Sequence, residues 1–367
     1  MMTMLDDAFE AGRSSQYVFF DRVALSAKFG INIATLSLAM LTSACFAGEM
    51  DCADIADIRI RDPFVVTDFA NGKYYLYSST SSAYGKDPPI STNFPIGVQV
   101  RTSKDLKTWS APRLCMTAPD WAAFVWAPEV HCFDGGYYMF ATLKRGDPRN
   151  PTVEMMGPTK EWNDAHRFRF SWHGTYVFKS SSPDGPFLLH STEPLSPRKW
   201  MCLDGTLTVQ DGRPYFVFTH DWAQIADGTI EFAPFKSDLS GLAAKPQTLF
   251  RASAVAPGTL RGVTDGPFVY RSAKSGKLFI TWSTHNPKKK RGDAYCVVAS
   301  VSATGKLEGP WKSHEIIFDK NGGHGMVFKT LEGNLMFVLH CPEIVGKERA
   351  RFYRFVDDGD KLSILEM

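Results

Sequence analysis

The feature that most constrains the fold of this chain is a unit of sequence that recurs five times. Each copy has a polar residue at the head of a β-rich run, then a turn with glycine, then a second run rich in aromatic and β-branched residues. In the first copy these parts are 61–66, 71–72 and 73–77. The turn glycines follow one another at intervals of 57 to 76 residues, and they are Gly72, Gly136, Gly212, Gly276 and Gly333. This spacing, with a constant order of elements, predicts a repeat architecture.

The second half of each copy supplies two further strands. In the first copy an alternating run over 97–103 is followed by a polar turn and a short run that ends at Trp109. No sustained helical periodicity follows residue 50. Residues 48–367 divide into five units of about 64 residues. The sequence therefore predicts an all-β fold, a five-bladed β-propeller with four antiparallel strands per blade, formed by residues 48–367 as one domain.

The first 47 residues have a different character. A largely apolar stretch without charges follows Lys28 and ends in the small residues before Gly48. This pattern is typical of a secretory signal peptide, here behind an N-terminal extension. We therefore expect a secreted or periplasmic protein. Cys45 resembles a lipoprotein attachment site, so a lipid anchor at Cys45 is the one membrane association that the sequence suggests.

Composition excludes several kinds of partner. The formal net charge of the 367-residue chain is +2, which gives no reason to expect a nucleic acid or a membrane surface as partner. We expect a monomer. The seven cysteines contain no Cys-x-x-Cys pair, which argues against a zinc cluster, and we expect buried free thiols rather than disulfides.

Each copy offers one polar group at the head of its first strand. If five blades close around an axis, these groups converge on one pocket; they are Asp62, Glu129, Asp204, Asp265 and His324. Carboxylates that share a pocket raise one another's pKa, which yields one ionised base and one protonated acid near neutral pH. Glycoside hydrolysis requires such a pair. A single Asp-Pro or Asp-Gly is more often a turn, so the interpretation depends on the whole set.

A second group of residues is predicted to contact the substrate. These are aromatic or histidine residues near strand heads or ends, where a ring can stack on a sugar face: Trp126, His220, Trp222, Trp282 and His324. For each tryptophan alone, packing between blades is the competing role. His324, between Gly323 and Gly325, faces either a ligand or the core.

Several motifs in order resemble glycoside hydrolase family 43 over residues 54–356. They are Arg61-Asp62-Pro63-Phe64, Trp126-Ala127-Pro128-Glu129-Val130, Leu203-Asp204-Gly205-Thr206 and Gly323-His324-Gly325. The resemblance implies an inverting hydrolase of α-L-arabinofuranosides or β-D-xylosides. By motif, Asp62 would be the general base and Asp204 would orient the acid. It also implies that no cofactor is required, although His324 matches a position near a calcium ion in some relatives.

The general acid is the point at which this chain departs from the family. The family usually has Glu-Gly-Pro where this sequence has Asp265-Gly266-Pro267. An aspartate is one methylene shorter, and a misplaced proton can lower the rate about 100-fold. Either Asp265 serves as the acid in an adjusted pocket, or Glu129 does.

We therefore predict an enzyme that releases terminal arabinofuranosyl or xylosyl units from plant-type polysaccharides or oligosaccharides. The alternative is a carbohydrate-binding propeller that has lost hydrolysis. The longest insertion, roughly 145–173 in the second blade, is expected to overhang the pocket.

Overall fold

The structure, a computed structural model, describes residues 52–81, 89–91, 93–145, 153–166, 172–255, 262–290 and 292–367. The predicted extension and signal peptide at 1–47 and the attachment site at Cys45 lie outside these residues. Within them, no helix has the length and apolar character needed to cross a membrane.

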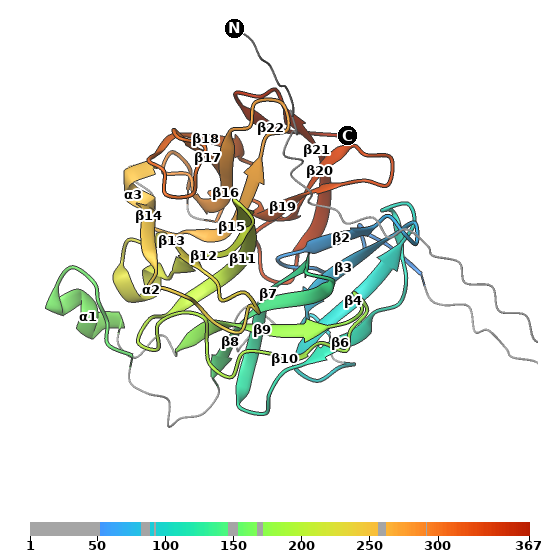
Figure 1. Cartoon of the computed structure of the whole chain (residues 1–367), viewed down its shortest axis with the longest axis horizontal. Helices are drawn as coiled ribbons and strands as arrows, with labels where there is room; N and C mark the ends of the chain where they lie inside the picture. The colour runs from blue at the N-terminus through green and yellow to red at the C-terminus, as the bar shows by residue number, and fades with distance from the viewer. Residues whose placement is uncertain are drawn as a thin grey trace, which may run out of the picture. The chain divides into compact units, whose positions relative to one another are not determined.

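Five four-stranded antiparallel sheets confirm the predicted propeller (Figure 1). The first strands of the sheets, called the inner strands here, lie closest to the centre of the view, and each sheet then continues outward. Blade 1 contains β2 (Phe64–Asp68), β3 (Lys73–Ser79), β4 (Gly97–Ser103) and β6 (Arg113–Thr117). Blade 2 contains β7 (Ala122–Phe133), β8 (Gly136–Arg145), β9 (His173–Ser180) and β10 (Leu188–Leu189).

The other three blades repeat this order. Blade 3 contains β11 (Cys202–Gln210), β12 (Arg213–His220), β13 (Thr229–Pro234) and β14 (Gln247–Arg251). Blade 4 contains β15 (Asp265–Arg271), β16 (Leu278–His285), β17 (Tyr295–Ser302) and β18 (Trp311–Phe318). Blade 5 contains β19 (Gly323–Lys329), β20 (Leu335–Cys341), β21 (Arg349–Asp357) and β22 (Leu362–Leu365).

A few short elements lie outside the blades. Strands β1 (Ala53–Asp54) and β5 (Thr108–Trp109) pair with each other. The described helices are α1 (Lys160–His166), α2 (Trp222–Ile225) and α3 (Ala252–Val255). All three are short and lie between consecutive strands, as expected for a chain without helical periodicity.

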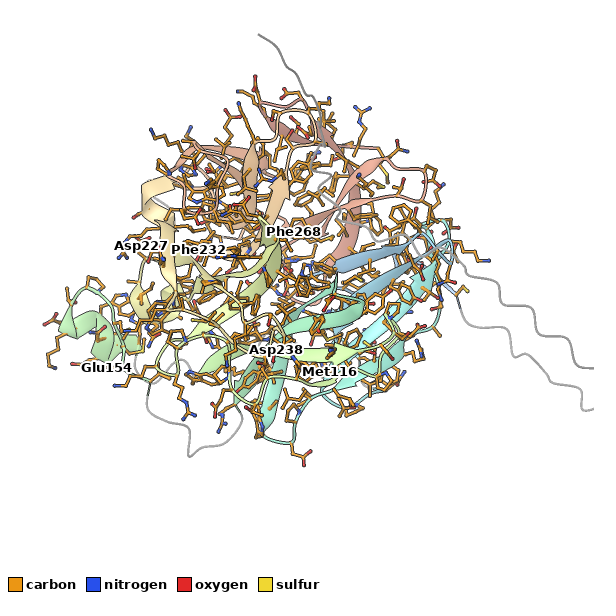
Figure 2. The ribbon with its side chains drawn as sticks, in the orientation of Figure 1. Met116, Glu154, Asp227, Phe232, Asp238 and Phe268 are labelled. Atoms are coloured by element: carbon orange, nitrogen blue, oxygen red, sulfur yellow. The ribbon has the colours of Figure 1, made fainter. Side chains whose placement is uncertain are left out.

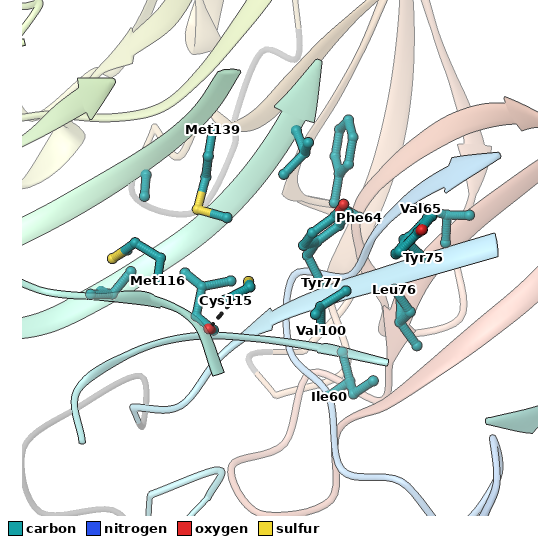
Figure 3. Close-up of a cluster of buried hydrophobic side chains, with 14 of the residues drawn as sticks. Ile60, Phe64, Val65, Tyr75, Leu76, Tyr77, Val100, Cys115, Met116 and Met139 are labelled. Atoms are coloured by element: carbon teal, nitrogen blue, oxygen red, sulfur yellow. Dashed lines mark hydrogen bonds between the residues drawn. The ribbon is translucent and has the colours of Figure 1, made fainter. Parts of the chain in front are cut away.

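Large side chains fill the spaces between the sheets (Figure 2). In the blade 1 region the buried cluster includes Phe64, Tyr77 and Val100, and Met139 of blade 2 lies in the same cluster (Figure 3). Between blades 2 and 3, Phe140 stacks on Phe216 with ring centroids 6.2 Å apart. Burial of such rings between blades is the main stabilisation available to a fold whose sheets share no strands.

The ring of blades closes between blade 5 and blade 1 without exchange of a strand. Every four-stranded sheet is built from one contiguous part of the chain. Across this seam Arg59 Nε contacts Glu348 Oε2 at 3.2 Å, and the backbone N–H of Leu331 donates to the Tyr74 hydroxyl at 2.7 Å. The backbone N–H of Ile60 donates to the carbonyl of Glu348 at 3.2 Å. Side-chain and loop contacts therefore hold the two ends of the propeller together.

The described cysteines are free thiols. Cys115, Cys202 and Cys296 are buried, as predicted, whereas Cys52 and Cys132 are exposed. Burial raises the pKa of the Cys202 thiol well above its usual value, which makes it a poor nucleophile.

Candidate active site

A left-handed backbone conformation recurs once in each blade, in or just before the inner strand. The φ angles are 50° at Asp62, 43° at Ala127, 54° at Asp204, 50° at Gly266 and 47° at His324. Residues other than glycine rarely adopt such angles. In four blades the strand pairing shifts register at this point, for example between Leu203 and Thr206, which is the signature of a β-bulge. We call these five residues the axial ring.

The axial ring corrects the equivalence expected from the sequence. Asp62, Asp204 and His324 do occupy equivalent places. Asp265 lies one residue before the ring position of its blade, and Glu129 lies two residues after it. The register shift spans the same step in blades 2 to 5, from the residue before the ring position to the second residue after it. The offset therefore comes from where each blade carries its acidic residue: blade 4 has it at the start of this step and blade 2 at its end.

Asp62 is surrounded by basic groups. Its Oδ1 atom lies 3.3 Å from His324 Nδ1 and 3.2 Å from His340 Nδ1, and its Oδ2 lies 3.8 Å from Arg61 Nε. Burial alone would raise the pKa of Asp62, but His324, Arg61 and His340 outweigh it and hold the pKa well below its usual range. Burial lowers the pKa of His324, so near neutral pH Arg61 and His340 are the partners that keep Asp62 ionised.

Asp204 lies near the same nitrogen of the His324 ring as Asp62 does. Its Oδ2 is 3.7 Å from His324 Nδ1 and accepts a hydrogen bond of 3.0 Å from the backbone N–H of Gly266. Burial raises the pKa of Asp204 well above its usual value, and the charges of Asp265 and Asp62 add to the rise. The Gly266 contact ties Asp204 to the residue that follows Asp265, so blades 3 and 4 bring these two carboxyl groups to one place.

Asp265 is a second carboxyl group that can hold a proton near neutral pH. Burial raises its pKa to about 7, and the negative charge of Asp221 adds to the rise. The hydroxyl of Tyr295 donates to Asp265 Oδ2 at 3.0 Å and opposes it. Burial also raises the pKa of Tyr295 well above its usual value, so this hydroxyl keeps its proton and remains a donor.

The link between Tyr295 and Asp265 gives a pH prediction. The Tyr295 hydroxyl favours the charged form of Asp265, so Tyr295→Phe raises the pKa of Asp265. A general acid must be protonated, and we expect the wild-type rate to fall as pH rises through about 7. In the variant this alkaline limb should move to higher pH by about one unit in kcat/KM profiles. An unchanged alkaline limb would show that another group sets it.

Glu129 is a further buried carboxyl group at this site. Its Oε2 contacts His131 Nε2 at 2.9 Å. It lines a small cavity together with Asp62, Phe64, His324 and Met326. Phe268 packs against Phe64 with ring centroids 6.4 Å apart and lies near the centre of the view in Figure 2. The lining of the cavity therefore combines the carboxyl groups of Asp62 and Glu129 with apolar side chains.

The predicted substrate contacts divide into two groups. Trp126 is partly exposed and lies on the same side of blade 2 as Phe124, whose ring is 6.2 Å away, and Lys144 Nζ lies 5.4 Å from the Trp126 ring. Trp222 is also partly exposed and begins α2, which is capped by the Asp221 carboxylate. Both indoles are partly exposed, and their contact with a sugar stays a prediction.

The structure does not bring His220 and Trp282 into that position. Trp282 is fully buried in a cluster with Phe250, because Ser283 faces the axis and adjacent residues of a strand face opposite sides. The indole N–H of Trp282 donates to Ser300 Oγ at 2.8 Å. His220 is buried beneath Trp200, with ring centroids 4.2 Å apart, and contacts Gln224. Packing replaces the expected substrate contact for both residues.

The part of the blade 2 insertion that the structure describes is attached to blade 3. The Gln224 side chain of α2 donates to the carbonyl of Glu154 at 2.7 Å, and the backbone N–H of Met156 donates to the carbonyl of Gln224 at 2.9 Å. Residues 146–152 and 167–171, which belong to the predicted overhang, lie outside the described part of the chain.

The described side chains near His324 do not form a calcium cage. Calcium takes six to eight oxygen ligands. Over the described ranges, no group of three or more His, Cys, Asp or Glu residues is arranged to hold a metal ion. The Nδ1 atom of His324 instead lies between Asp62 and Asp204. A calcium ion near His324 stays a prediction from the family resemblance, and no step below depends on it.

Sequence reasoning missed several residues of this site. His340, Tyr295 and Glu343 lie far from the inner strands in sequence yet contact the predicted carboxylates or their partners. A signal for His340 was present, because the corresponding second-strand positions of the other blades carry a serine or threonine. An alignment of the repeats on their second strands would have shown it.

Comparison with known proteins gives a consistent result. The model of the glycosyl hydrolases family 43 matches residues 55–355. An endo-arabinase structure from Bacteroides thetaiotaomicron VPI-5482 is 30% identical with a TM-score of 0.68, and the match covers 84% of this chain and 98% of that one. A search of curated proteins finds no match.

Two more distant structures share the fold. A thermostable family-43 glycoside hydrolase is 22% identical with a TM-score of 0.64, covering 83% of this chain and 92% of that one. An α-L-arabinofuranosidase from Lactobacillus brevis is 18% identical with a TM-score of 0.62, covering 83% and 93%. At these identities the likeness concerns the propeller alone.

Proposed function

Because this chain belongs to the family 43 glycosyl hydrolases, we propose that it is an inverting enzyme that releases terminal α-L-arabinofuranosyl units from plant-type oligosaccharides or polysaccharides. The observation that carries the proposal is the contrast between two carboxyl groups at one axis. Asp62 has a pKa well below its usual range, whereas burial raises the pKa of Asp265 to about 7. One group is ready to accept a proton and the other to donate one.

In this proposal Asp62 is the general base. Its carboxylate takes a proton from a water molecule as that water attacks the anomeric carbon. Asp265 is the general acid and gives its proton to the leaving oxygen. The two residues come from blades 1 and 4, which are separated by blade 5 on one side and by blades 2 and 3 on the other. An inverting reaction needs such a separation, because water must fit between the base and the sugar.

Asp204 has a positioning role in the proposed reaction. It accepts the backbone N–H of Gly266, directly after Asp265, and so holds the segment that carries the acid. Burial raises the pKa of Asp204 well above its usual value, and the charge of Asp265 adds to the rise. We assign the acid to Asp265 rather than to Glu129, because burial raises the pKa of Asp265 to about 7, whereas Glu129 is paired with His131.

The substrate class rests on two observations. The model of the glycosyl hydrolases family 43 matches residues 55–355, which supports a glycoside as the substrate. The similar Bacteroides protein is an endo-arabinase, which favours arabinofuranosyl over β-D-xylosyl units. We further propose action outside the cytoplasm, on the basis of the signal-peptide pattern over 1–47.

A substrate panel with product analysis tests this function. We expect turnover of aryl α-L-arabinofuranoside and of linear arabino-oligosaccharides, with arabinose as the first product. Proton NMR of fresh product should show the inverted anomer. Retention of configuration, or early release of mixed oligosaccharides, would contradict the inverting or the terminal mode of action respectively.

A further inference from the structure

One position in the second strand carries the same kind of residue in four blades and a different kind in blade 5. In blades 2 to 5 this residue pairs with the residue just before the axial ring, and blade 1 has Ser79 at the corresponding place. The first four blades carry a hydroxyl here: Ser79, Thr142, Thr219 and Ser283. Blade 5 carries His340.

In blades 2 and 4 the hydroxyl at this position supports the ring residue of the next blade. Thr142 Oγ1 accepts the backbone N–H of Asp204 at 3.1 Å, and Ser283 Oγ accepts the backbone N–H of His324 at 2.8 Å. His340 Nδ1 lies 3.3 Å from the backbone nitrogen of Asp62, in the same relation. A hydroxyl would be sufficient for that bond, so the larger ring requires another explanation.

The imidazole of His340 adds contacts that a hydroxyl cannot make. It is fully buried, with Nδ1 3.2 Å from Asp62 Oδ1 and Nε2 2.5 Å from Glu343 Oε2. Glu343 is in turn held by Arg61, whose guanidinium lies 2.8 Å from Glu343 Oε1. When Nδ1 carries a proton it donates to the Asp62 carboxylate, and when it is bare it can accept the Asp62 backbone N–H.

We propose that His340 is a positioning residue for Asp62, with Glu343 fixing the orientation of the imidazole ring. This inference rests on the proposed function, in which Asp62 is the base. The ring of Tyr295 covers the imidazole at a centroid distance of 5.8 Å and an angle of 20°, which restricts its rotation. The same tyrosine donates to Asp265, so one aromatic ring supports both sides of the site.

Other charged groups also face Asp62, so the effect of His340 on Asp62 must be distinguished from theirs. They are His324 from β19, Arg61 from its own segment, and the carboxyl groups of Asp204 and Asp265. His324 contacts the same oxygen as His340, Oδ1, whereas Arg61 lies near Oδ2. His340 is the described residue that contacts both the carboxylate and the backbone of Asp62.

A pair of amide substitutions separates the two contacts of the ring. The side-chain nitrogen of asparagine can take the place of Nδ1, and that of glutamine the place of Nε2. We expect His340→Asn to keep at least a tenth of the wild-type kcat. His340→Gln keeps the Glu343 contact but loses Asp62, so its kcat should fall about 100-fold with little change in KM. Its acid limb should also move to higher pH, because loss of a donor raises the pKa of Asp62.

His314→Gln is the matched control. This histidine lies in β18 of blade 4 and contacts Ser300 Oγ at 2.7 Å, away from the axis. It should affect thermal stability without moving the acid limb. Equal kcat values for the asparagine and glutamine variants of His340, with unmoved acid limbs, would overturn the inference.

A measurement without turnover distinguishes failure of this inference from failure of the proposed function. In protein labelled with ¹⁵N-histidine, the His340 ring signal should shift on Asp62→Asn. If the wild type hydrolyses no pentoside, the function fails, but a shifted signal still supports the contact. If the wild type is active and the His340 signal is unchanged by Asp62→Asn, the inference fails and the function stands.

Discussion

Asp62→Asn should lower kcat on arabino-oligosaccharides by about 1,000- to 10,000-fold, at the upper end of what one acid–base group contributes. The amide cannot accept a proton from water, yet it nearly preserves the size of the carboxylate. Because the site is buried, bulk water is also excluded and cannot accept the proton in place of Asp62. Steady-state kinetics on purified protein, with unfolding monitored by circular dichroism, measures the effect.

The matched control for this variant is Asp68→Asn. Asp68 ends β2 of the same blade and contacts Asn71 on the surface, far along the strand from Asp62. Its substitution should leave kcat within about twofold, because exposed changes of this kind have small effects. A folded Asp62→Asn protein with undiminished turnover would reject Asp62 as the base.

Asp265→Asn should reduce cleavage of arabino-oligosaccharides by about 100- to 10,000-fold while affecting aryl substrates with good leaving groups much less. The reason is that a sugar alkoxide needs a proton to depart, whereas an activated phenolate does not. The ratio of kcat/KM values for the two substrates therefore reports the acid directly. Asp265→Asn should also abolish the alkaline limb near pH 7.

Glu129→Gln provides the comparison that decides between the two candidate acids. We expect it to lower the rates on both substrates by a similar factor, since Glu129 is buried and paired with His131. If Glu129→Gln shows the leaving-group dependence and Asp265→Asn does not, Glu129 is the acid. In that case the aspartate at position 265, where the family usually has glutamate, would reflect transfer of the acid role to Glu129 rather than an adjusted pocket.

The sequence predicted the fold well because its signals are local. Turn glycines, alternation of apolar and polar residues and the constant order of strands all lie within short segments. The turn glycines still differ in detail between blades. In blade 1 the left-handed glycine is the predicted Gly72, with φ of 62°, whereas in blade 2 it is Gly135 rather than Gly136. The number of blades followed from spacing alone.

The levels of the carboxyl groups could not be predicted in the same way. The left-handed residue of each inner strand has no fixed residue type, so the sequence did not show that Asp265 precedes this position and that Glu129 follows it. Trp282 looked available at a strand end but faces the interior of the blades. The contacts of His340 depend on closure of the ring, which joins residues 278 positions apart.

The seam between the last blade and the first has a consequence for how this enzyme loses activity. The proposed base stands on one side of that junction, and His340, Glu343 and Glu348 stand on the other. No strand crosses the junction. If blades 5 and 1 move slightly apart, the proposed base is therefore separated from these partners while every sheet remains intact. Heat or denaturant would thus inactivate a protein that still looks folded by its backbone, and assays of catalysis would register damage before spectroscopy does.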